Sequence, residues 1–124
     1  MDFLTTTYNR SYVQTYNLGF GGATVDQALI SSPYGPSVQS FRQQITETFL
    51  PKYSDHKAVP WASDDTLFTF FFGINDVILS YESRNDSLNY ALIKDYEGLV
   101  NQVSTVPLRF LSLASLSGGV LTRF

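Results

Sequence analysis

The sequence lacks cysteine and has a single histidine among its 124 residues. The lack of cysteine excludes disulfides, a thiolate nucleophile and cysteine-based zinc sites, and one histidine cannot form a histidine-rich metal site. We therefore expect no metal and no cofactor. His56 directly follows Asp55, and neighbouring side chains point apart, so the pair does not indicate a catalytic dyad. We expect His56 to lie in an exposed loop.

Basic residues are also few, and no long apolar run is present. Eight Lys and Arg stand against eleven Asp and Glu, a net charge of −3, and the scattered basic residues argue against a nucleic-acid partner. No apolar run approaches membrane-spanning length, and the start MDFLTTT lacks the basic and apolar regions of a secretory signal peptide. Sequons at Asn9 and Asn85 nevertheless suit an exported, glycosylated parent protein.

Apolar residues are plentiful, at 44% of the chain with 15% aromatic, which suffices for the core of one small domain or part of a larger one. Residues 13–18 and 66–72 have the β-branched and aromatic composition of strands. Apolar residues recur every three or four positions over residues 38–50, which predicts a helix that Ser37 begins and Pro51 ends. A second helix is predicted from Asp86 or Ser87 to Val103. This alternation predicts an α/β fold.

Polar loops follow both predicted strands. The first strand leads into GFGGATVD at residues 19–26, where backbone N–H groups can point at an anion or an oxyanion. The loop is not a P-loop and fails the G-x-G-x-x-G pattern at its last position, so a dinucleotide is not expected. The second strand runs into GIND at residues 73–76, where the Asn75 amide can donate to a developing negative charge without titrating. The alternative interpretation is that Asn75 and Asp76 form a turn and cap the next element.

Two further features have no clear function. Trp61 lies in an aperiodic stretch and is expected to pack against the core, with ligand binding as the alternative. The tail, residues 104–124, is dominated by leucine, serine and glycine. A strand over residues 108–111 has no supporting pattern around it, and the tail contains no G-x-S-x-G nucleophile elbow.

Taken together, NLGFGGATVD at residues 17–26 and FGIND at residues 72–76 resemble blocks II and III of the SGNH, or GDSL, lipases and esterases. The residue pattern of these two blocks is most similar to that of fungal acetylesterases of carbohydrate esterase family 16, and the resemblance covers residues 3–103. It implies a three-layer α/β/α, flavodoxin-like fold and a secreted hydrolase acting on ester bonds. The substrate it implies is a small-molecule or polysaccharide ester. It also implies that the Gly22 backbone N–H and the Asn75 side-chain amide are the oxyanion-hole donors.

The sequence departs from the family in the groups that perform the chemistry. No Gly-Asp-Ser is present to provide the nucleophile, and Tyr53 stands three positions before the histidine, where the family has aspartate. We therefore expect residues 1–103 to be a partial hydrolase domain with blocks II and III only, inactive alone. It would lack the first central strand, which in the family lies between the strands ending at these two blocks, and the C-terminal part. The edges of the two predicted strands, which would face the missing strand, would then be exposed. For residues 104–124 one hypothesis is translated intron sequence, because the codons of Val103 and Ser104 are compatible with a 5′ splice site.

Two other functions remain open at this point. One is a non-catalytic carbohydrate-binding remnant in which Trp61 and nearby tyrosines stack on sugar rings. The other is a small α/β protein with an unrelated ligand. Hydrolysis of p-nitrophenyl acetate and binding to insoluble xylan distinguish these hypotheses from an esterase.

Overall fold

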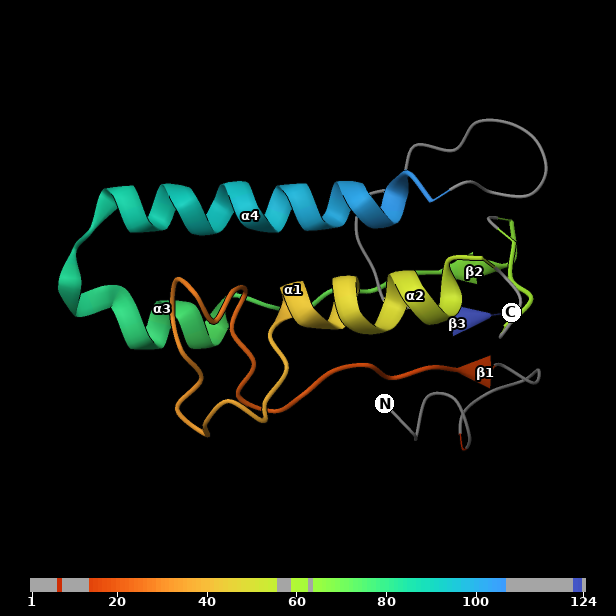
Figure 1. Ribbon diagram of the computed structural model, residues 1–124, viewed down its shortest axis with the longest axis horizontal. Helices are drawn as coiled ribbons and strands as arrows, with labels where there is room; N and C mark the ends of the chain where they lie inside the picture. The colour runs from red at the N-terminus through yellow and green to blue at the C-terminus, as the bar shows by residue number, and fades with distance from the viewer. Residues whose placement is uncertain (1–6, 8–13, 56–58, 63, 107–121, 124) are drawn as a thin grey trace.

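The computed structural model describes residues 7, 14–55, 59–62, 64–106 and 122–123. The expectations for His56, for the strand over 108–111 and for most of the tail lie outside these residues. Two helical rods dominate the described chain and run side by side (Figure 1). The first joins α1 (Phe41–Gln43), a π-helical turn (Gln44–Phe49) and α2 (Leu50–Tyr53), and the second is α4 (Asp86–Ser104). The short helix α3 (Ile74–Ser80) and a 3₁₀ turn (Tyr81–Ser83) precede α4.

Both predicted helices are present, with different ends. The first begins after Ser40, not Ser37, because Ser40 and Gln43 form a reciprocal capping box. It also continues past Pro51 to Tyr53, and Leu50 and Pro51 follow directly on the π-helical turn. The N-cap of α4 is Asn85, whose side-chain oxygen accepts a hydrogen bond from the Leu88 N–H at 3.1 Å.

The strands are much shorter than predicted. β1 (Gln14–Thr15) and β2 (Thr66–Leu67) each have two residues, and β3 (Thr122–Arg123) pairs antiparallel with both, in the order β1-β3-β2. Residues 16–18 and 68–72 run on as extended chain beyond these pairings (Figure 1). They form no ladder because no neighbouring strand lies beside them in the described part of the chain.

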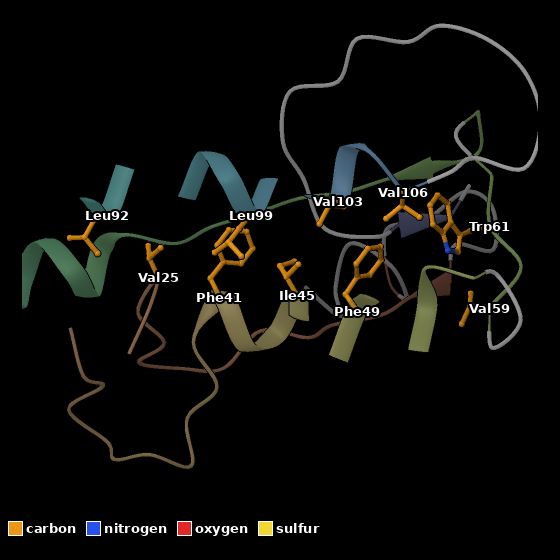
Figure 2. Packing of buried hydrophobic residues seen from close by; sticks show 10 residues of the cluster. All are labelled: Val25, Phe41, Ile45, Phe49, Val59, Trp61, Leu92, Leu99, Val103 and Val106. Carbon is orange, nitrogen blue, oxygen red and sulfur yellow. The ribbon is translucent and has the colours of Figure 1, made fainter. Parts of the chain in front are cut away.

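The core lies between the two helical rods. Figure 2 shows its ten buried apolar residues as a row from Leu92 at one end to Trp61 and Val59 at the other. Phe41 is 1% exposed and stacks on Phe72 with ring centroids 4.3 Å apart. Leu99 of α4 is fully buried. The core therefore fixes the segment that leads from β2 to α3.

Trp61 packs in this core, as predicted. Its indole is 6% exposed, meets Phe68 edge-on at 5.2 Å and donates a hydrogen bond to the Tyr53 carbonyl at 2.8 Å. A buried ring cannot stack on a sugar from outside. Among the helices of the described residues, none combines the length and apolar character needed to cross a membrane.

Candidate functional site

The glycine loop after β1 has a defined backbone shape. The Asn17 side-chain oxygen accepts a hydrogen bond from the Gly19 N–H at 3.0 Å, and a turn joins the Ala23 N–H to the Phe20 carbonyl at 3.3 Å. Gly22 has φ +79°, a left-handed conformation that glycine adopts without steric cost. A Cβ at this position would also lie 2.5 Å from Cε2 of Tyr34. The loop therefore requires glycine at position 22.

The second loop turns directly into helix α3. Gly73, at φ +101°, is the N-cap residue, so Asn75 and Asp76 lie in the first turn of the helix. Both side chains reach across to the glycine loop. The turn-and-cap alternative does not account for these two contacts.

The structure brings the two predicted site residues together. The Asn75 Nδ2 donates to the carbonyl of Ala23, the residue after Gly22, at 2.8 Å. The Val25 N–H donates to both carboxylate oxygens of Asp76, at 3.0 and 3.1 Å, across 51 positions of sequence. Asp76 is only 2% exposed. These bonds fix the glycine loop against the start of α3.

Unused donors remain at this junction. An asparagine amide has two N–H groups, and the bond to Ala23 uses one of them. Within the described chain the Gly22 N–H makes no hydrogen bond. Both residues line one cavity of about 330 Å³. One backbone donor and one side-chain donor therefore remain without a partner among the described residues that line this cavity.

The cavity beneath these donors is apolar. Its walls are residues 16–23 and 68–72, joined by Ile74 and Asn75, and helix residues from Phe41 to Phe49 form its floor with Val103. No charged side chain is among the described residues that line it. An apolar surrounding strengthens any hydrogen bond made to a charged oxygen at its edge.

Burial raises the pKa of the Asp76 carboxyl above its ordinary value, and the hydrogen bond from the Val25 N–H opposes this shift. A raised pKa in the folded state means that folding favours the protonated acid. The stabilisation is therefore complete below the unfolded-state pKa of about 3.9 and is lost as pH rises through the folded-state pKa. The Asp76 carboxyl therefore contributes less to stability at high pH than at low pH.

Replacing Asp76 with asparagine should remove this pH dependence while keeping an oxygen that can accept from Val25. The free energy of unfolding of the native chain, minus that of Asp76→Asn, is expected to fall as pH rises from about 3 to about 7. Urea unfolding of both proteins across this range measures the difference, and groups common to both cancel. A difference that grows with pH would contradict the predicted direction.

Replacing Gly22 with alanine should destabilise the chain by about 1–2 kcal/mol, because an L-residue is strained in the left-handed region. The new methyl group must also displace the Tyr34 ring, which is exposed and has space to move. Gly21→Ala is the matched control, since a Cβ there meets nothing within 4 Å. Urea unfolding compares the two variants, and equal losses would count against a special requirement at Gly22.

An ion-pair network connects the end of the glycine loop to the helices. The sequence did not indicate it. The Arg42 Nε donates to Asp26 at 2.7 Å, and its Nη2 pairs with Asp95 of α4. Burial raises the pKa of Asp95, Arg42 lowers it and the nearby Asp26 raises it. The network joins the loop, α1 and α4. In the described residues no group of three or more metal-ligating side chains is present.

Comparison with known proteins gives one informative relative. The chain is 34% identical over 97 residues to an acetylesterase of Thermothelomyces thermophilus, a match that covers 77% of this chain and 32% of the acetylesterase. The chain thus spans about a third of the length of that relative. No family model and no solved structure matches the chain. The match supports a relationship to ester hydrolases.

Proposed function

We propose that this chain provides the oxyanion-binding part of a serine ester hydrolase of the SGNH type. The observation that carries the proposal is the shared cavity edge of Gly22 and Asn75, held by the Asn75 to Ala23 hydrogen bond. The relationship to an acetylesterase supports an ester as the substrate class. The parent fold in this proposal is a three-layer α/β/α sheet protein, of which residues 1–103 form a part.

The proposed chemistry is acyl transfer through an acyl-enzyme. When a serine attacks the ester carbonyl, negative charge develops on the carbonyl oxygen. The Gly22 N–H and the free N–H of Asn75 then donate to that oxygen and stabilise the tetrahedral intermediate. Gly-Asp-Ser and Asp-x-x-His do not occur in the sequence, so the nucleophile and its base are contributed by residues outside it. The proposed substrates are acetyl esters of small molecules or plant polysaccharide, in the extracellular space. The carbohydrate-binding alternative loses its main support because Trp61 is buried.

A chimaera tests this function directly. The matching stretch of the acetylesterase is replaced by the residues of this chain, which brings the donors together with that enzyme's own remaining residues. We expect the chimaera to hydrolyse p-nitrophenyl acetate, and this chain alone to release nitrophenol no faster than buffer. A chimaera that folds but has no activity would count against the proposal. Turnover by the isolated chain would show that the nucleophile lies within it.

A further inference from the structure

Tyr34 places an exposed aromatic ring directly beside the proposed oxyanion glycine. The ring contacts Gly22, since a Cβ built on that glycine would lie 2.5 Å from the Tyr34 Cε2. Tyr34 is nevertheless 73% exposed, so most of its ring faces solvent. Gly22 lines the apolar cavity, whereas Tyr34 does not. The ring therefore lies outside the cavity, against a residue that forms part of the cavity's edge.

Hydrogen bonds hold the backbone of Tyr34 at this position. The hydroxyl of the buried Ser32 donates to the Gly22 carbonyl at 2.9 Å and accepts from the Tyr34 N–H at 3.3 Å. The Gly35 N–H closes a turn onto the Ser32 carbonyl at 3.2 Å. A proline on each side of the Tyr34-Gly35 pair restricts the chain further. A ligand that binds the ring therefore has little loop to order, which lowers the cost of binding.

The chemistry around the ring suits a sugar. A pyranose has a face of C–H groups and hydroxyls at its rim, and tyrosine offers an apolar ring with one polar group at its tip. Among the described residues the Tyr34 hydroxyl has no hydrogen-bond partner, so it can bind a sugar hydroxyl. The loop SSPYGPS, residues 31–37, has no charged side chain and no aromatic ring besides this one. An anionic alcohol finds no cation in this loop, and a long alkyl chain finds no continuous apolar surface.

We infer that Tyr34 is a specificity-determining residue of the proposed hydrolase: its ring receives the alcohol part of the ester and selects a sugar ring over a small acyclic alcohol. The inference rests on the proposed function, which places the ester carbonyl at the Gly22 and Asn75 donors. An ester carbonyl carries an acyl group on one side and the alcohol group on the other. Because the Tyr34 ring contacts Gly22, an alcohol group that extends out of the cavity can reach the ring.

Binding to the full chain tests the stacking without catalysis. The probe is the triacetate of methyl β-xylopyranoside, with ethyl acetate as the acyclic comparison. In proton NMR the ring signals of Tyr34 are those that Tyr34→Ala removes. We expect the sugar triacetate to shift these signals saturably and ethyl acetate at equal concentration not to shift them. An absence of the shift, or sugar binding that is unchanged in Tyr34→Ala, overturns the inference and leaves the proposed function standing.

The chimaera tests the selectivity itself. The quantity measured is the ratio of kcat/KM for the sugar triacetate to kcat/KM for ethyl acetate. Tyr34→Ala should lower this ratio by about three- to tenfold, the effect expected of one aromatic contact. Tyr34→Phe keeps the ring and should retain most of the ratio. Tyr81→Ala removes an equally exposed tyrosine, on the 3₁₀ turn before α4, and should leave the ratio unchanged.

The possible results separate the inference from the proposed function. An unchanged ratio in Tyr34→Ala overturns the inference, and so does an equal fall in Tyr81→Ala. Equal losses of kcat/KM for both substrates in Tyr34→Ala leave the ratio unchanged and would mean that Tyr34 only supports Gly22. A chimaera without any activity counts against the proposed function, and the NMR titration then decides the inference alone.

Discussion

Replacing Phe41 with alanine is expected to lower the free energy of unfolding by about 3–5 kcal/mol, because it empties the centre of the core. The Phe41 ring is 1% exposed and contacts Phe70, Phe72 and Tyr96, with centroids 4.3 to 5.3 Å away. Urea unfolding measures the loss. The same substitution should also release the segment that positions Gly73 and Asn75, and amide exchange along α3 would report this.

Phe71→Ala is the matched control for this experiment. The two phenylalanines have the same volume, but Phe71 is 87% exposed, so its removal should change stability by less than about 0.5 kcal/mol. Similar losses for both variants would mean that Phe41 does not organise the core as described.

In the active chimaera, Asn75→Ala should lower kcat by about 10² to 10³-fold with little change in KM. The reason is that the amide donates to an oxygen that carries full negative charge only in the tetrahedral intermediate. Asn89→Ala, on the exposed face of α4, should leave kcat unchanged. Steady-state hydrolysis of p-nitrophenyl acetate gives both constants.

Asn75 also donates to the Ala23 carbonyl, so a lower activity of Asn75→Ala has two candidate causes, the missing donor and local unfolding. Titration of the reactive serine with an organophosphorus ester counts the folded sites, and kcat per titrated site separates the two effects. A loss confined to the number of sites would show that Asn75 is structural and does not contact the oxyanion.

The sequence predicted the features that depend on local pattern. The spacing of apolar residues identified both long helices, because a helical face is set by its own sequence. The helix starts were missed by one to three positions, since several polar residues compete to cap and packing decides among them. The strand lengths were wrong because a ladder needs a neighbour, and no local pattern specifies one.

The proximity of Gly22 and Asn75 was implied by the family resemblance, but the bonds that create it were not predicted. Asp76 accepts from Val25 across 51 residues, and Arg42 pairs with Asp26 and Asp95 on two different elements. Such pairs depend on tertiary placement, which one sequence does not show. The clash that excludes a side chain at Gly22 involves Tyr34, and the sequence likewise did not predict it.

The link from Asp76 to Val25 has a consequence for how such an enzyme is assembled. Helix α3, and not the sheet, supplies the bonds from Asn75 and Asp76 that hold the glycine loop. On the proposed function, the part that binds the oxyanion is then held in place by contacts within this chain, separately from the residues that provide the nucleophile.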